Sequence, residues 1–157
     1  MKPVDHLDLS VLRLLATQPR AGIREYARQM GVARATVQAR IDRLQECGVL
    51  PSLRPQIAPE GLGFEVLAYV HLHLAQGKLD EATRRLATIP QILEADSIAG
   101  EGDLLCHVVA RNNNDLETVI QHILATPGVI RSRTEVVLNK RIKPRVLPLL
   151  DLLRGTE

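Results

Sequence analysis

The feature that most constrains this chain is a pair of short helical patterns that meet at Gly31. Apolar residues recur at helical spacing on both sides of this glycine. They are Ile23, Ala27 and Met30 before it and Val37, Ile41 and Leu44 after it. A tight corner between two helices favours positive φ, which glycine adopts without steric cost. The stretch from Ile23 to Gln45 is therefore predicted to form a helix-turn-helix.

The second of these helices is polar away from its apolar residues. Guanidinium groups bind phosphates and guanine edges, and Gln and Thr side chains reach base edges, so this surface suits a DNA major groove. We assign base contacts to Arg34, Thr36 and Gln38, at the entering end of the helix, and phosphate contacts to Arg24, Arg40 and Arg43. The alternative is a solvated helix surface with no partner. The small Ala27 and the Gly31 turn favour the DNA interpretation.

The charge is distributed unevenly along the 157 residues. Residues 1–57 carry nine Lys or Arg against five Asp or Glu, whereas residues 58–157 carry eleven against thirteen. A basic segment that coincides with the helix-turn-helix is expected when that segment binds a polyphosphate. Aromatic residues make up 2% of the chain and Trp is absent, which argues against base stacking on single strands. Double-stranded DNA is the expected partner.

The spacing of the cysteines does not indicate a metal site, and the apolar stretches do not indicate a membrane-spanning segment. Cys47 and Cys106 stand alone, and no zinc-ligand pattern surrounds them. His71 and His73 alternate on one strand face, but no clear third ligand accompanies them, and a strand at a subunit contact explains them equally well. Charges and prolines interrupt every apolar stretch before it reaches about 20 residues. We expect a cytoplasmic protein that holds no metal and no cofactor and does not contact a membrane.

From residue 64 onward the hydrophobic period changes from helical to alternating. The predicted order is strand, helix, strand, strand, helix, strand, over Phe64–Leu74, Leu79–Ile89, Ile92–Ile98, Leu104–Ala110, a helix capped by Asn114 that runs to Ala125, and Val129–Leu138. This order is the ferredoxin-like split βαβ arrangement, in which both helices pack on one sheet face. The other face then needs a cover, and a second copy of the chain is the natural one.

These patterns predict an α+β chain of two domains. Residues 1–57 form a winged helix-turn-helix domain whose first helix starts at Asp5 and whose short ribbon involves Val49 to Ile57. Residues 58–63 form a linker. Residues 64–157 form a ferredoxin-like domain for ligand binding and dimerisation, including a last apolar segment from Val146 to Leu153.

The chain resembles the Lrp/AsnC family of transcriptional regulators over nearly its whole length. The marks of the resemblance are ordered along the sequence. They are Leu7, Asp8, Val11 and Leu12; Gly31 and Val32; Arg40, Ile41 and Leu44 with Gly48, Val49 and Leu50; Pro59, Leu62, Gly63 and Phe64; the loop from Gly100 to Asp103; and Pro127, Gly128 and Val129 with Arg133 and Thr134. The chain departs from the family pattern at Ala33 and Gly22, where Ser, Thr or Asn commonly caps a helix, and at Pro51 and Ser52.

The resemblance implies a homodimer that assembles further into an octamer and binds a small effector, usually an amino acid. It implies an effector site at Gly100, Glu101, Gly102 and Asp103, with Arg133, Thr134 and Glu135 as further candidates. The loop chemistry fits, because glycine amides can hold a carboxylate and acidic side chains can meet an ammonium group. The alternative is an ordinary turn, since Gly and Asp are the usual turn residues.

Two alternative functions, each of a different class from an effector-controlled regulator, are compatible with this layout. Sirohaem decarboxylases resemble this layout and use histidines around a tetrapyrrole, for which His71, His73 and His107 are available here. That enzyme reading is disfavoured because the Gly100–Asp103 loop stands where those proteins have an aromatic-rich segment. A protein that coats DNA through phosphate contacts alone is the third reading. We predict a DNA-binding regulator and no enzyme activity.

Overall fold

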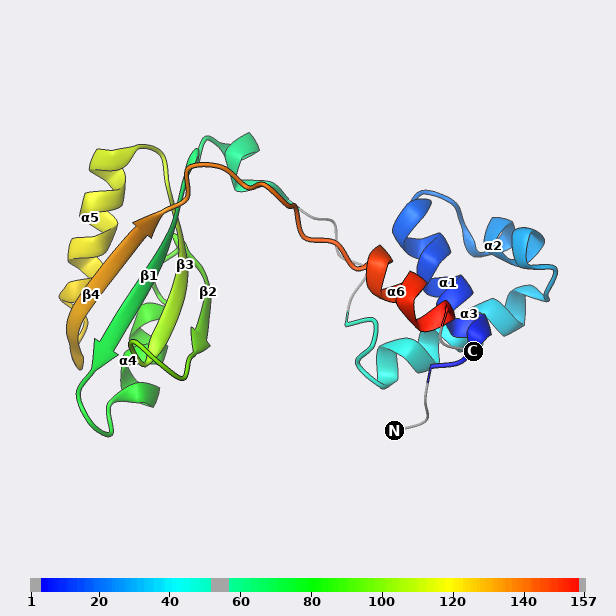
Figure 1. Ribbon diagram of the computed structural model, residues 1–157, viewed down its shortest axis with the longest axis horizontal. Helices are drawn as coiled ribbons and strands as arrows, with labels where there is room; N and C mark the ends of the chain where they lie inside the picture. Colours follow the sequence, from blue (N-terminus) through cyan, green and yellow to red (C-terminus); the bar gives the residue numbers. More distant parts are fainter. Residues whose placement is uncertain (1–3, 52–56, 156–157) are drawn as a thin grey trace. The chain divides into compact units, whose positions relative to one another are not determined.

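The computed structural model describes residues 4–51 and 57–155, which form two compact units (Figure 1). The first unit takes the chain up to residue 55 and again from residue 142, and the second takes residues 56–141. No helix among the described residues has the length and apolar character needed to span a membrane.

The first unit contains the predicted helix-turn-helix. Its helices are α1 (His6–Thr17), α2 (Ile23–Met30), α3 (Arg34–Glu46) and α6 (Leu147–Arg154). Gly31 ends α2 in the left-handed region at φ 66°, as the corner requires. The buried core of the unit comprises Leu9, Val11, Leu12, Tyr26, Ala27, Val37, Ile41, Leu44 and Leu150. The apolar residues predicted to face inward on α3 are therefore all buried.

Helix α1 begins with a complete capping box. The backbone amide of Asp8 donates to Asp5 Oδ1 at 2.9 Å, and the amide of Asp5 donates to Asp8 Oδ2 at 2.9 Å. These two bonds satisfy amides that the first helical turn leaves without partners. The predicted start at Asp5 is confirmed.

Helix α6 packs on α1 and so belongs to the first unit. Leu150 is buried in the helical core, Asp151 pairs with Arg13, and Arg154 Nη2 donates to Ser10 Oγ at 2.9 Å. Figure 1 shows α6 beside α1 within this unit. The sequence prediction placed this segment in the 64–157 domain, whereas the structure divides the chain near residue 142. The physical reason is that Leu150 finds its apolar neighbours in the helical core.

The second unit is a four-stranded antiparallel sheet with two helices. Its elements are β1 (Val66–Leu74), α4 (Leu79–Leu86), β2 (Ile92–Ser97), β3 (Leu104–Ala110), α5 (Asn113–Leu124) and β4 (Val129–Val136). The strands lie in the order β2-β3-β1-β4. Both the element order and the strand order are those of the predicted ferredoxin-like fold.

Both helices cover the same face of this sheet. Alternate strand residues such as Val70 and Cys106 pack there against Leu86 of α4 and Val119 of α5. Neither helix packs on the opposite face, which we call the outer face. At one end of it, Pro59 and Leu62 line a hollow together with Val109, which is buried. Cross-strand register places on the outer face Glu94 and Asp96 of β2, Leu105, His107 and Val109 of β3, Leu67, Tyr69, His71 and His73 of β1, and Arg131, Arg133 and Glu135 of β4.

Three local predictions differ from the structure or lie outside it. Asn112, rather than Asn114, caps α5, because Asn112 Oδ1 accepts from the amide of Asp115 at 2.9 Å. The predicted linker is ordered into a short 3-10 helix (Pro59–Leu62). The proposed wing falls largely on residues 52–56, which lie outside the described residues, and the described residues 49–51 and 57 contain no strand.

Candidate functional site

The polar residues of α3 divide into two flanks, one on each side of its buried stripe. With about 100° between successive residues, Arg34, Gln38 and Asp42 fall on one flank and Thr36, Arg40 and Arg43 on the other. Arg34 and Gln38 are exposed, and Gln38 Nε2 donates to Asp42 Oδ1 at 2.6 Å. We call this exposed side the Arg34 flank. Asp42 is exposed as well.

The other flank, which we call the Arg40 flank, faces α1. The Arg40 guanidinium pairs with Asp5 and reaches Asp8 Oδ1 at 3.2 Å, and the Arg43 guanidinium pairs with Asp8 Oδ2. The Asp8 side chain is fully buried, and both arginine side chains are more than two-thirds buried. Burial of a carboxylate is costly unless charged partners and hydrogen bonds compensate it. Arg40 and Arg43 therefore hold α3 against α1.

The capping carboxylate of Asp5 is also tied into this network. Desolvation acts to raise its pKa, but the Asp8 amide and the Arg40 guanidinium outweigh that effect and hold the pKa at about 2. Hydrogen bonds to the Asp5 and Asp8 carboxylates raise the pKa of Arg40. Both groups are therefore charged at neutral pH.

The remaining predicted DNA contacts have different surroundings. Arg24 of α2 is exposed, whereas Thr36 is half-buried on the Arg40 flank. Ala33 precedes α3 without a side-chain cap, and only its backbone carbonyl accepts, from the amides of Thr36 at 3.0 Å and Val37 at 3.3 Å. The structure thus leaves Arg24, Arg34 and Gln38 accessible to a ligand.

The predicted effector loop is fastened to β1 by Asp103. Its amide donates to the Leu72 carbonyl at 2.8 Å, and its Oδ2 accepts from the Leu74 amide at 2.7 Å. Gly102 has φ 99°, and a Cβ on it would lie 3.1 Å from the Leu72 oxygen. Asp103 and Gly102 therefore shape the loop. Glu101, the other acidic residue of the loop, does not bond to the β1 backbone through its carboxylate.

Glu101 joins a charged cluster on the outer face. Arg133 pairs with Glu101 and donates to Glu135 Oε1 at 2.7 Å. His71 lies beside them, with Nδ1 3.3 Å from the Glu101 carbonyl oxygen and Nε2 3.9 Å from Glu135 Oε2. The structure thus brings Glu101, Arg133 and Glu135 together. Thr134 is registered opposite Val70 and lies on the helix-covered face, away from this cluster.

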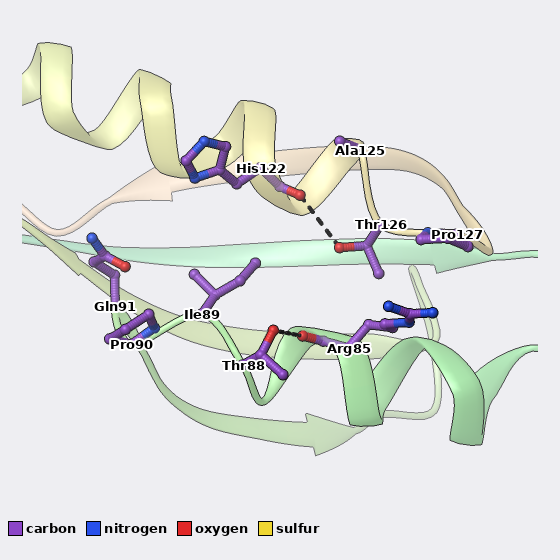
Figure 2. A pocket seen from close by; sticks show the side chains of 9 residues that line it. All are labelled: Arg85, Thr88, Ile89, Pro90, Gln91, His122, Ala125, Thr126 and Pro127. Carbon is purple, nitrogen blue, oxygen red and sulfur yellow. Dashed lines mark hydrogen bonds between the residues drawn. The ribbon is translucent and has the colours of Figure 1, made fainter.

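A separate hollow of about 370 Å³ lies where α4 and α5 end (Figure 2). His122 lines it from the α5 side and Arg85 from the α4 side, and Ile89 and Pro127 also line it. Thr88 Oγ1 donates to the Arg85 carbonyl at 2.7 Å there. The carboxyl ends of two helices carry partial negative charge, which disfavours a bound carboxylate. None of the predicted effector residues lines this hollow.

Comparison with protein families matches both units. Residues 4–45 match the AsnC-type helix-turn-helix domain, and residues 67–147 match the Lrp/AsnC ligand binding domain. The chain belongs to the Lrp/AsnC family. Members of this family that resemble it are DNA-binding transcriptional regulators. The HTH-type transcriptional regulator FL11 of Pyrococcus horikoshii is 30% identical, over 94% of this chain and 97% of that protein.

Solved structures of the family have the same fold. The feast or famine regulatory protein of M. tuberculosis, complexed with L-methionine, superposes with a TM-score of 0.81 and 30% identity, over 91% of this chain and 97% of that one. E. coli AsnC superposes with a TM-score of 0.85 at 24% identity, over 93% and 99% of the two chains. The resemblance seen in the sequence and the predicted fold class are confirmed.

Proposed function

We propose that this Lrp/AsnC regulator reads operator DNA through the Arg34 flank of α3. The observation that carries this proposal is the division of α3, in which Arg34 and Gln38 are exposed while Arg40 and Arg43 bind acids of α1. Arg34 and Gln38 have the donors and acceptors needed at base edges. Arg24, on α2, is placed to neutralise a phosphate. Arg40 and Arg43 act by fixing the orientation of α3 against α1.

We propose that the regulator acts as a homodimer formed through the outer face of the sheet, and that dimers assemble further into an octamer. The support is a sheet face on which neither α4 nor α5 packs, since both helices lie on the other face. A twofold axis presents two α3 helices to half-sites about one DNA turn, or a multiple of it, apart. A role in the cytoplasm without enzymatic activity follows from DNA as the partner.

The proposed effector is an amino acid bound at the cluster of Glu101, Arg133 and Glu135. The M. tuberculosis relative, 30% identical, is complexed with L-methionine. In this chain the cluster offers a guanidinium for an α-carboxylate and two carboxylates for an α-ammonium group. An effector changes DNA binding only if it binds one arrangement of the assembly more tightly than another.

A DNA titration tests the proposed function. The full chain is titrated against the DNA upstream of its own gene and against an unrelated fragment of equal length, at one fixed salt concentration. Preference for the upstream DNA by about 10³-fold or more is expected for a specific regulator. Equal, salt-sensitive binding to both fragments contradicts sequence reading and favours a DNA-coating protein.

The effector site has its own test. The titration is repeated with each amino acid, first with the wild-type chain and then with Arg133→Ala. The amino acid that shifts the wild-type binding curve is expected to have no effect on Arg133→Ala. Arg131→Ala is the matched control, because Arg131 lies two residues earlier on the same strand face and contacts His73 instead. An unchanged response in Arg133→Ala excludes this cluster as the site.

A further inference from the structure

The two sides of the outer face are charged in different ways. On the β4 side, Glu101 and Glu135 are both paired with Arg133. On the β2 side, Glu94 and Asp96 stand two residues apart on the same strand face, and within residues 57–141 neither forms an ion pair with a Lys or Arg. Two neighbouring carboxylates without a basic partner repel one another. A bound cation relieves that repulsion.

His107 of β3 completes a set of three possible ligands. It is registered opposite Glu94, and its Nδ1 lies 3.2 Å from Glu94 Oε2. One ligand atom each from Glu94, Asp96 and His107 lies within 4.8 Å of the others. We propose that these three residues bind a divalent transition-metal ion of the Zn²⁺ class. This site is distinct from the effector cluster, by which we mean Glu101, Arg133 and Glu135, and does not depend on it.

A β-bulge creates the arrangement. Ile92 is paired with Val108 on the helix-covered face, and the register then shifts so that Glu94, two residues later, is paired with His107 on the outer face. Without this extra residue, strict alternation would place Glu94 and Asp96 on the same face as Ile92. The bulge thus turns both carboxylates toward the imidazole. Strand β2 is also an edge strand, so the site lies at the rim of the sheet.

Tyr69 separates the site from the effector cluster and orients the histidine. Across the sheet the register runs from Glu135 through Tyr69 to His107 and Glu94. The Tyr69 and His107 rings meet edge to face, with centroids 4.7 Å apart and an interplanar angle of 76°. This contact limits rotation of the imidazole, and an oriented ligand loses less entropy when it binds a metal.

The donor set selects among cations. One imidazole nitrogen and two carboxylate oxygens suit Zn²⁺, Co²⁺ or Ni²⁺, whereas Mg²⁺ and Ca²⁺ prefer ligand sets made of oxygen. Three protein ligands leave a fourth position of a tetrahedral ion open to water or to another ligand. The side chains of Glu94 and His107 are 60% and 30% exposed in the single chain, and the edge position of β2 keeps the site at the rim of the outer face, where an ion reaches it from solvent.

The test is calorimetric titration of Zn²⁺ into the full-length, untagged chain after removal of metal with a chelator. A Cys47→Ser background prevents the exposed thiol from contributing. One ion per chain is expected, with no binding of Mg²⁺ under the same conditions. His107→Gln and Glu94→Gln are each expected to weaken Zn²⁺ binding by at least about 10-fold, since even outer-shell losses have effects of that size.

The control variants are His71→Gln and His73→Gln, which remove other imidazoles from the same sheet face. They are expected to bind Zn²⁺ as the parent does. Circular dichroism checks that each variant is folded. The proposal is overturned if the parent binds no Zn²⁺, or if His107→Gln binds it with the affinity and stoichiometry of the parent.

Discussion

The two flanks of α3 carry similar side chains but have different partners. On the Arg34 flank, Arg34 and Gln38 are both exposed. Gln38 bonds to Asp42 of the same helix, and Arg34 forms no ion pair with another described residue. On the Arg40 flank, Arg40 and Arg43 reach across to Asp5 and the buried Asp8 of α1. The difference shows that basic residues on one helix can have different partners. The position of each relative to the buried stripe decides whether it meets solvent or a neighbouring helix.

The largest expected effect comes from removing the acid that both arginines share. Asp8→Ala deletes the acceptor of two guanidinium groups and half of the α1 capping box, so we expect the free energy of unfolding to fall by about 3 kcal/mol. Urea unfolding followed by tyrosine fluorescence measures it. In a Tyr69→Phe background, Tyr26 is the remaining tyrosine of the chain and reports on the helical unit. Asp42→Ala, an exposed acid on the Arg34 flank, is the control, and a loss below 1 kcal/mol in Asp8→Ala contradicts the shared role.

The next effect separates the two flanks by stability. Arg43→Ala leaves Asp8 with one guanidinium partner instead of two and should lower the free energy of unfolding by about 1.5–3 kcal/mol, the range for a charged hydrogen bond. Arg34→Ala should change it by less than about 0.5 kcal/mol, as for an ordinary surface substitution. The same fluorescence assay measures both variants. Equal losses in the two would remove the distinction between the flanks.

DNA binding should show the opposite pattern. Gln38→Ala should reduce discrimination between the operator and an unrelated fragment by about 1–3 kcal/mol, because a base contact is lost. Its stability should be unchanged, since the side chain of Gln38 bonds to the exposed Asp42 and to no other residue in the described part of the chain. Fluorescence anisotropy at fixed salt gives both dissociation constants. Uniform weakening on the two fragments would instead identify Gln38 as a phosphate contact.

The smallest effect is the pH dependence that Asp5 contributes. Its pKa is about 2 in the folded chain against a usual value of 3.8, so the unfolded chain binds the proton more readily. The stabilisation is therefore complete above about pH 4 and is lost as the pH falls toward 2. Unfolding of the wild type and of Asp5→Asn, measured from pH 5 to pH 2.5, should converge toward the acid end. A constant difference across that range would show that Asp5 does not titrate in this way.

Much of the fold was predictable because it depends on local patterns. The φ of Gly31, the capping box of Asp5 and Asp8, and the alternation along β1 each follow from residues close together in the sequence. The three consecutive asparagines at the start of α5, residues 112–114, show where local reasoning stops. Each can cap a helix, and Asn112 does so because the backbone turns there, with the Arg111 amide donating to Asp115.

The candidate sites were predictable in part. The sequence indicated the charged residues of the Gly100–Asp103 loop and of β4, and the structure brings Glu101, Arg133 and Glu135 together. It gave no signal that Asp103 would be used to hold the loop on β1, or that Thr134 would face the helices. The Glu94, Asp96 and His107 cluster was missed because a β-bulge reverses the alternation of β2.

By itself, the sequence determined the order and type of the elements, the helix-turn-helix and the family to which the chain belongs. These depend on the period of apolar residues and on turn chemistry, which act over a few residues. The tertiary structure alone decided that Arg40 and Arg43 meet Asp8, and that Leu150 of α6 joins the helical core. The physical reason is that a buried charge needs a partner of opposite charge and an apolar side chain needs apolar neighbours. Here those neighbours come from segments far apart in the sequence, so packing decides which ones they are.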